Sequence, residues 1–582
     1  MLLVVLPAAF NPSGVLAFEP LKTSLLRCAA VLIGVFWLWR RLEGRGQSVD
    51  VGAHPVVRAG LALIALAAVS TAFSIEPRLS FFGSFDRGMG WLSLAAGGML
   101  LVAAADLFAD EAGRERAITA LLLGSFIPCA YMLVQRSGLD PLHWASLGAP
   151  GSTFGSPTFL GGYLALVAPF ALYRVMVRAR QASFLAYAGW LALLLVICSV
   201  VLMTTIRGPV LGLIVGVLTL AGLGGVGSMR RIGKFELAAA GGLLVAAVAL
   251  AVAATGVRGI EGLQRFVAIG QPIDSSSQRL TVWQDALRAP LSDPGRVLIG
   301  YGAETQSVIF EHAEATVRRT PIELWDRAHD LVLDTWLTGG LIGVGALSLV
   351  LILTVRSALQ ARASGPGSLL PAVILAALAG HLVEVAFAFH TVVTGAIFWV
   401  LLGLAASLTP RSLTNHVPFR PRLAVFASTL GVLLLPVMAV PAVADGLYGA
   451  ARRSDYEAGA RLEEQAAAWA PWIEELPRAA GLDWQQVATR RADPAAGVRA
   501  EQDLREAAAR APLLPTPHVR LARLYLARGD LGAAEQACQR AISTGPYRAT
   551  SWDVCADVSA GSGLTDEAGQ RRSRADALRQ PG

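Results

Sequence analysis

The strongest candidates for chemistry are polar residues at the borders of apolar runs. Arg207 lies between two such runs, and His329, followed by Asp330, comes directly before another. The planar fork of an arginine suits a diphosphate, and an imidazole accepts a proton from a hydroxyl near neutral pH. An arginine at a membrane boundary also serves as a simple anchor, and a lone histidine is more often structural. The residue types predict a site for a phosphorylated substrate, in which His329 acts as a base.

Other candidates accompany this pair. Arg279 and Trp283 are four residues apart, so they share one face of a helix. That face either lies on a bilayer surface or binds a sugar or phosphate. Arg87 precedes Gly88, and Tyr301 lies between two glycines. We predict that His329 and Arg207 are the catalytic residues. The residues predicted to bind the donor diphosphate or the substrate are Arg279, Arg87, Trp283, Tyr301 and Asp330.

Several kinds of chemistry have no support in the sequence. The chain has no GxxxxGK[ST] loop, HExxH helix or DxD pair, and its five cysteines lack a metal-ligand spacing. We therefore expect no metal and no cofactor. His381, Glu384 and His390 lie in or beside an apolar run, which favours a hydrogen-bond network inside a bundle.

The amino-acid composition indicates the class of protein that holds these candidate residues in place. Of 582 residues, 54% are hydrophobic and 16% are charged, and the mean hydropathy is +0.54. A soluble domain carries roughly 25% charged residues, so a single soluble globule is excluded. The net charge of +7 comes almost wholly from arginines placed between apolar runs. This placement is typical of a membrane protein rather than a nucleic-acid-binding protein.

The apolar runs predict an all-α, polytopic membrane helix bundle of about 12–13 transmembrane helices. A span needs about 20 mostly apolar residues. The first of the thirteen runs is short and contains Pro7, and the last ends near Val443. The runs start near residues 1, 24, 56, 89, 116, 158, 184, 208, 236, 331, 369, 390 and 423.

Loop charges predict the orientation. Alternate loops hold sixteen basic residues, whereas the other short loops hold mainly Lys22, Arg78, Arg87 and Arg207. Because cytoplasmic loops are enriched in Lys and Arg, the N-terminus is expected inside the cell. An odd number of spans then places the C-terminus outside, together with a long loop over residues 257–328.

The tail after the last run predicts a second domain. We expect a transmembrane domain over residues 1–443 and an extracytoplasmic helical domain over 444–582. Tyr525, Gly529, Ala534 and Pro546 occur at the spacings of a tetratricopeptide unit, and similar positions recur 34 residues away. The tail is thus predicted to be soluble and α-helical, with tetratricopeptide-like repeats at about 480–580; a helical hairpin without a partner is the alternative. Cys538 and Cys555 in this tail either form a disulfide or pack a helix seam.

These motifs together resemble the O-antigen ligase family of membrane glycosyltransferases. The resemblance covers roughly residues 60–405. Arg207 and Leu211 match its Arg-x3-Leu motif, and His329, Gly340 and Gly343 match its histidine motif. Residues 154–158 are similar to the family's Phe-Gly-Asn-Pro-Asn turn. Ser156, Thr158 and Asp330 depart from the usual residues.

The resemblance implies a GT-C-like bundle that transfers a glycan from an undecaprenyl-diphosphate donor to an acceptor hydroxyl, with inversion and without a metal. The implied partners are the bilayer, the carrier-linked glycan and a glycolipid, glycan or protein acceptor, but no nucleic acid. The implied location is the outer face of the cytoplasmic membrane. A polymerase and a protein O-oligosaccharyltransferase are alternatives within this family. A membrane scaffold or transporter with partner-binding repeats is the alternative without enzymatic activity.

Overall fold

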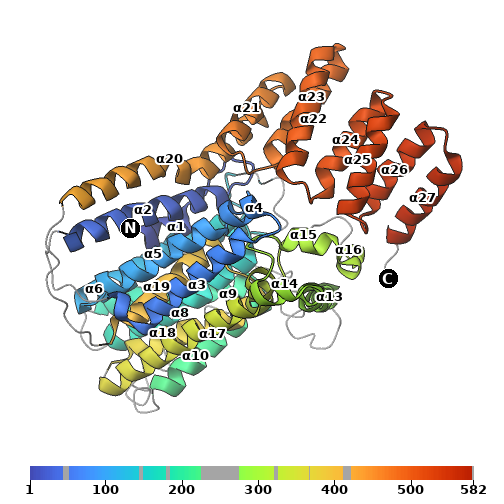
Figure 1. The fold of residues 1–582 in the computed structure, drawn as a ribbon. Helices are drawn as coiled ribbons and strands as arrows, with labels where there is room; N and C mark the ends of the chain where they lie inside the picture. Colours follow the sequence, from blue (N-terminus) through green and yellow to red (C-terminus); the bar gives the residue numbers. More distant parts are fainter. Residues whose placement is uncertain are drawn as a thin grey trace.

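The computed structural model describes residues 1–42, 51–142, 144, 149–178, 184–224, 274–319, 325–365, 368–409 and 421–579. Every regular element within these ranges is a helix, which confirms the all-α prediction. Figure 1 shows a bundle of helices and, at one end of it, a second group of helices formed by the C-terminal part of the chain.

Seven candidate spans in the described part of the chain are long and apolar enough to cross a membrane. At 1.5 Å per residue, about 20 residues cover the hydrocarbon core. They are α2 (Glu19–Leu42), α3 (Pro55–Ala72), α6 with α7 (Glu111–Gly124 and Phe126–Arg136), α8 (Pro157–Arg178), α9 (Phe184–Met203), α17 (Leu331–Ser364) and α20 (Pro421–Ala451). Four shorter apolar helices accompany them: α5 (Trp91–Leu107), α10 (Arg207–Gly224), α18 (Leu370–Val385) and α19 (Val392–Ser407).

Two of the thirteen predicted runs have a different outcome. The first forms only α1 (Leu2–Ala8), seven residues that are too few to span a bilayer. Pro7 lies in its last turn, and the Pro7 carbonyl accepts a hydrogen bond from the Thr153 hydroxyl at 2.6 Å. The run near residue 236 lies outside the described residues. The total of 12–13 spans therefore stays a prediction.

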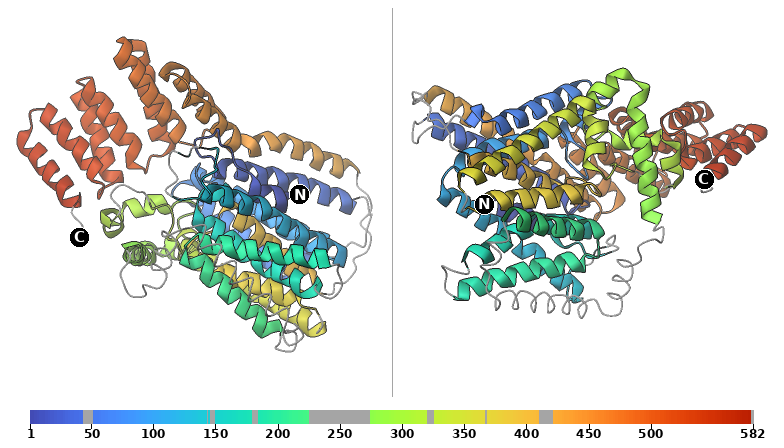
Figure 2. Two further views of the ribbon diagram at one scale, coloured as in Figure 1. Left: turned by 180° about the vertical axis from the view of Figure 1, so that it is seen from behind. Right: turned by 90° about the horizontal axis from the view of Figure 1, so that it is seen from below.

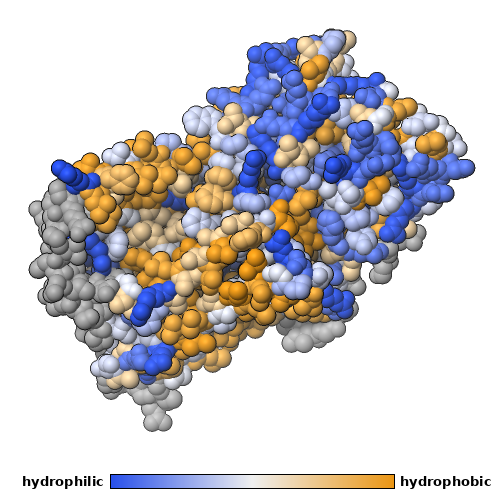
Figure 3. All heavy atoms as spheres, in the orientation of Figure 1, coloured by the Kyte–Doolittle hydropathy of each residue, from blue (hydrophilic) through white to orange (hydrophobic). Residues whose placement is uncertain are grey.

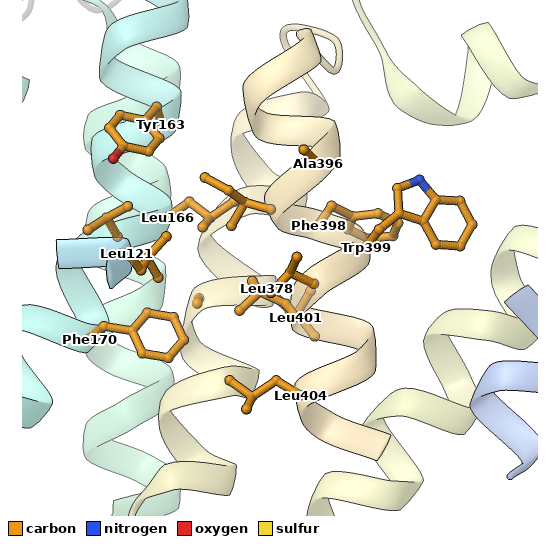
Figure 4. Close-up of a cluster of buried hydrophobic side chains, with 14 of the residues drawn as sticks. Leu121, Tyr163, Leu166, Phe170, Leu378, Ala396, Phe398, Trp399, Leu401 and Leu404 are labelled. Atoms are coloured by element: carbon orange, nitrogen blue, oxygen red, sulfur yellow. The ribbon is translucent and has the colours of Figure 1, made fainter. Parts of the chain in front are cut away.

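The shortest apolar helices form the centre of the bundle. All 16 residues of α19 are buried, as are most residues of α18. Figure 4 shows Leu401 of α19 beside Leu378, and both belong to one buried cluster with Leu166 and Phe170. A helix surrounded by other helices meets little lipid, so its apolar sequence reflects the protein core. Figure 3 shows that the apolar surface lies over the bundle, whereas the C-terminal helices are largely hydrophilic.

Short helices between α10 and α17 lie at one end of the bundle, on the side of the C-terminal group (Figures 1 and 2). They are α13 (Asp274–Arg288), α14 (Pro294–Ile299), α15 (Gln306–Glu311) and α16 (Glu314–Arg319). The carboxylate of Glu311 in α15 accepts two hydrogen bonds from Arg548 Nε, at 3.0 and 2.8 Å. This contact joins the loop region to the C-terminal helices.

The C-terminal group consists of antiparallel helices. They are α21 (Tyr456–Trp469), α22 (Glu475–Arg491), α23 (Pro494–Arg510), α24 (Pro515–Ala527), α25 (Leu531–Thr544), α26 (Ala549–Gly561) and α27 (Thr565–Arg579). Small residues such as Ala522, Ala534 and Ala541 are buried in this group. The identity of these repeats as tetratricopeptide units stays a prediction.

Two further details concern this region. Cys538 and Cys555 form a disulfide that links α25 to α26. Of the two alternatives for these cysteines, a disulfide or the packing of a helix seam, the structure has the disulfide. Helix α20 continues past Val443 to Ala451, and Ala444 packs in one cluster with Ala466 and Leu476. The predicted boundary at residue 443 therefore falls inside a continuous helix.

Candidate active site

His329 lies in the short segment that leads into α17. Its φ is +56°, a left-handed conformation that a side chain other than glycine adopts only where its surroundings enforce it. The imidazole lies edge-on to two rings, with centroids 5.0 Å from Trp325 and 5.1 Å from Phe389. Nδ1 lies 3.2 Å from the Arg327 carbonyl. Because a carbonyl only accepts, Nδ1 carries the proton, and the lone pair of the neutral ring is on Nε2.

The electrostatic surroundings keep this ring neutral. Burial lowers the pKa of His329 to about 4; Asp326 opposes this shift, while Arg279 and Arg87 add to it. All three side chains therefore lie close enough to act on the imidazole. Burial opposes ionisation of Asp326 itself, but Arg87 and Arg327 hold the pKa of that carboxyl below its usual range. The neutral imidazole keeps a lone pair that can accept a proton; the arginines lower its proton affinity, and Asp326 offsets part of that loss.

Phe389, in the turn between α18 and α19, is the centre of this arrangement. The guanidinium carbon of Arg87 lies 5.1 Å from its ring centroid, and that of Arg327 lies at 5.7 Å. Arg87 Nε donates to Asp326 Oδ2 at 2.5 Å. The structure thus brings Arg87 beside His329, about 240 residues away in sequence, but commits part of its guanidinium to Asp326.

The same turn approaches the other predicted residues. Trp283 in α13 lies 6.3 Å from the Phe387 ring, and its indole N–H donates to the Ala328 carbonyl at 2.9 Å. Arg207, which is half-buried, is the first residue of α10. A β-carbon on the next residue, Gly208, would lie 3.9 Å from Phe387 Cβ. Arg207 and Trp283 are therefore both near Phe387, and Phe389, two residues further along this turn, contacts His329.

Two predicted residues have structural contacts instead. Asp330 Oδ1 accepts from the Leu333 N–H at 2.8 Å, so its side chain caps α17. The Tyr301 hydroxyl donates to the Ala289 carbonyl at 2.8 Å, and the Tyr301 N–H donates to the Leu337 carbonyl at 2.8 Å. These contacts fix the loop against α17 and show no side chain aimed at His329.

The glycine of the histidine motif has a packing role. Gly340 has a φ of +60°, and a β-carbon there would collide with the carbonyl of Leu298. The helix α17 is kinked at this residue. Only glycine lets the loop around residue 300 approach α17 so closely.

Several residues of the site were missed by the sequence reasoning. Arg327 and Glu304 form a buried ion pair at 2.5 Å, and Arg327 also donates to Gln306 Oε1 at 3.1 Å. The charged residues directly before His329 were a usable signal for Asp326 and Arg327. Phe389 had no signal, because a phenylalanine in an apolar run resembles any core residue.

Two pockets meet at this ion pair. The first, about 260 Å³, lies between α3, α5, α17 and α19 and is lined mainly by apolar side chains such as Leu63 and Ile342. The second, about 360 Å³, is polar and extends between the bundle end and the C-terminal helices. Glu304 and Arg327 line both pockets.

The predicted network at His381 is only partly formed. Its ring stacks on that of His390 with centroids 5.0 Å apart, and Nδ1 lies 3.5 Å from Glu384 Oε2. Among the described residues, neither nitrogen of His381 has a hydrogen-bond partner. His390 also lines the apolar pocket.

The fold and this site define a multi-pass membrane protein with a histidine and several arginines gathered at one end of its bundle. Residues 191–348 match the family model described as O-antigen ligase, so this segment is similar to an O-antigen ligase domain. The match runs from α9 into α17 and includes Arg207, Arg279 and His329, but neither Arg87 nor the C-terminal helices. No curated protein shows a significant sequence match to the chain.

Proposed function

We propose that the protein transfers a glycan from an undecaprenyl-diphosphate carrier to an acceptor hydroxyl, with inversion and without a metal. The observation that carries this proposal is the imidazole of His329, whose Nδ1 is bound to a backbone carbonyl and which lies among Arg87, Arg279 and Asp326. The O-antigen ligase match over the same segment supports it.

Each residue has a definite task in this reaction. The acceptor oxygen attacks the anomeric carbon, the bond from that carbon to the diphosphate breaks, and the hydroxyl proton passes to His329 Nε2. Arg207 and Arg279 hold the diphosphate as it leaves and stabilise its growing negative charge. Arg87 positions Asp326 beside the imidazole, and Trp283 fixes the backbone before His329. Tyr301 and Asp330 support the segment through backbone contacts.

The proposed location is the outer face of the cytoplasmic membrane. The charge asymmetry of the loops and the disulfide between Cys538 and Cys555 support an extracytoplasmic site and C-terminal domain. Because α1 has only seven residues and does not span, the same loop charges now favour an N-terminus on the outer side of α2, together with Lys22, rather than the cytoplasmic N-terminus predicted from thirteen spans. The C-terminal helices, as tetratricopeptide-like repeats from about residue 480 onward, would bind a partner or an acceptor.

The acceptor decides between the related activities. A glycolipid core would make the protein a ligase, a second carrier-linked repeat a polymerase, and a protein an O-oligosaccharyltransferase. A scaffold or transporter, in contrast, would not need His329.

The test is glycan transfer by purified protein in lipid nanodiscs, with chelator present and donor binding measured in parallel. His329→Ala should bind the donor normally and transfer it about 100- to 10,000-fold more slowly, the usual effect of losing a general base. His312→Ala is the matched control, because His312 is an exposed histidine of the same loop region. Near-normal transfer by His329→Ala would exclude this mechanism and favour the scaffold. Loss of transfer in chelator alone would point to a metal.

A further inference from the structure

The polar pocket between the bundle and the C-terminal helices has walls from both parts of the chain. Arg87, Asp326 and Arg327 form the wall next to His329. The opposite wall comes from the C-terminal part and includes Trp472, Glu475 and Arg478. The pocket therefore extends from the candidate active site to a domain that lies outside the O-antigen ligase match.

The two walls are held together by specific contacts. The Trp472 ring stacks on Phe82 with centroids 4.0 Å apart and an interplanar angle of 9°. Phe85 packs in one buried cluster with Ile473 and Leu476. Arg510 donates to the carbonyls of Ala470 and Ile473, at 3.0 and 2.8 Å, and so fixes the turn before α22. The pocket is a built feature rather than a chance gap between two domains.

The charges in the pocket restrict its ligand. Seven carboxylates and four guanidinium groups line it. All four arginines are already paired. Arg87 contacts Asp326, Arg327 contacts Glu304 and Arg478 contacts Glu474 at 2.9 Å, while Arg510 pairs with Glu506 in α23. Burial raises the pKa of the remaining carboxyl groups, Glu76, Asp86 and Glu475, the last to about 8, so the pocket offers protonated or weakly charged carboxyl groups and no unpaired cation for a phosphate or a uronic acid. Carboxyl groups do accept hydrogen bonds from hydroxyls and ammonium groups.

The shape of the pocket restricts the ligand further. A volume of about 360 Å³ suits a small compact ligand rather than a long chain. A bound peptide would need an open sheet edge or an apolar groove. The described walls contain no strand edge, and half of their lining residues are charged, so they do not form an apolar groove. An aromatic ring beside several carboxyl groups instead suits a sugar, which has an apolar face and a rim of hydroxyls.

We propose that this pocket binds the acceptor as a neutral or amine-bearing saccharide, with Glu475 and Trp472 of the C-terminal part as its recognition residues. This inference rests on the proposed function, because it assigns the acceptor of that reaction. The acceptor then approaches His329 from the side of Arg87 and Asp326, while the diphosphate lies on the side of Arg207 and Arg279. Displacement with inversion requires the nucleophile and the leaving group on opposite sides of the anomeric carbon.

The first test is direct binding, measured without turnover by saturation-transfer NMR on the full-length protein in nanodiscs. The probes are glucose, galactose, mannose, glucosamine, glucuronic acid and inorganic phosphate. At least one neutral or amino sugar should bind, and the two anions should bind at least about tenfold more weakly. Glu475→Ala should weaken sugar binding about tenfold, because the hydrogen bonds of its carboxyl group to the sugar are lost. Asp566→Ala, an exposed carboxylate in α27, is the matched control.

Three binding results would overturn the proposal. The first is that no sugar binds, and the second is that glucuronic acid binds as tightly as the neutral or amino sugars. The third is that Glu475→Ala binds the sugar as tightly as the wild-type protein. Trp472→Phe keeps an aromatic ring on Phe82, so it tests the sugar contact without undocking the domain; it should weaken sugar binding and leave the melting temperature unchanged.

The second test is transfer kinetics. Glu475→Ala should raise KM for the acceptor about tenfold while KM for the donor and kcat stay within about twofold. A raised KM for the donor would mean that the donor glycan occupies the pocket, and the proposal would be wrong. The binding result does not depend on catalysis. If His329→Ala transfers normally but the sugar still binds through Glu475, the proposed mechanism fails and the pocket assignment survives.

Discussion

The pH dependence of transfer tests the state of His329 more sharply than a substitution. Burial lowers its pKa to about 4, so the imidazole stays neutral far into the acidic range. A general base works only while it is unprotonated. Activity should therefore be retained as the pH falls below 6.5, the ordinary pKa of histidine, and should be lost only near pH 4.

The size of the effect follows from these two pKa values. At pH 5.5, a histidine with a pKa of 4 is about 97% neutral, whereas an ordinary exposed histidine is only about 9% neutral. Wild-type kcat/KM should thus be nearly the same at pH 7 and pH 5.5, and should fall about tenfold for each unit below pH 4. The sign is fixed by desolvation, which disfavours the charged ring.

The assay is the initial rate of glycan transfer in nanodiscs between pH 4 and pH 8, with subsaturating acceptor. Enzyme held at each pH and returned to pH 7 must recover its full rate, which separates titration from unfolding. An acidic limb centred near pH 6.5 would refute the reasoning, because it would mean that the imidazole is solvated or is not the base. Asp326→Asn should move the acidic limb to lower pH, since Asp326 raises the pKa of the imidazole.

Three further predictions concern single contacts. Arg207→Lys keeps the charge but loses the planar fork, so KM for the donor should rise at least about tenfold; an unchanged KM would leave Arg207 as an anchor only. Asp330→Ala should lower the free energy of unfolding by about 1 kcal/mol through loss of a helix cap, and transfer should fall far less than in His329→Ala. Arg548→Ala leaves the Glu311 carboxylate buried without its partner, so the melting temperature should drop, and adding Glu311→Gln should restore most of it.

Much of the fold could be predicted because hydropathy is a local property. Eleven of the thirteen apolar runs correspond to described helices, and the tail is helical as predicted. The prediction that the first run spans the membrane was wrong. Pro7 and the turn after it end the helix, and a count of apolar residues does not take this into account. Hydropathy also cannot distinguish helices that face lipid from α18 and α19, which are buried in protein.

The site was predictable only where residue type and sequence position coincide. His329, Arg207 and Arg279 border apolar runs or a long loop, and the structure gathers His329 and Arg279 in one place. The hydrogen bonds of Asp330 and Tyr301 to backbone groups depend on local geometry that spacing does not encode. Phe389 and Glu304 act through contacts with residues far away in the chain, so no local pattern marks them.

The polar pocket changes how the C-terminal part of the chain should be regarded. Trp472, Glu475 and Arg478 line the same pocket as Arg87 and Arg327, and the Trp472 ring stacks directly on Phe82 at the end of the bundle. A truncation at Ala451, where α20 ends, would remove one wall of that pocket and expose the buried cluster around Phe85. The C-terminal helices are therefore structurally part of the candidate site, and a protein cut there should lose acceptor selection even if its transmembrane helices fold.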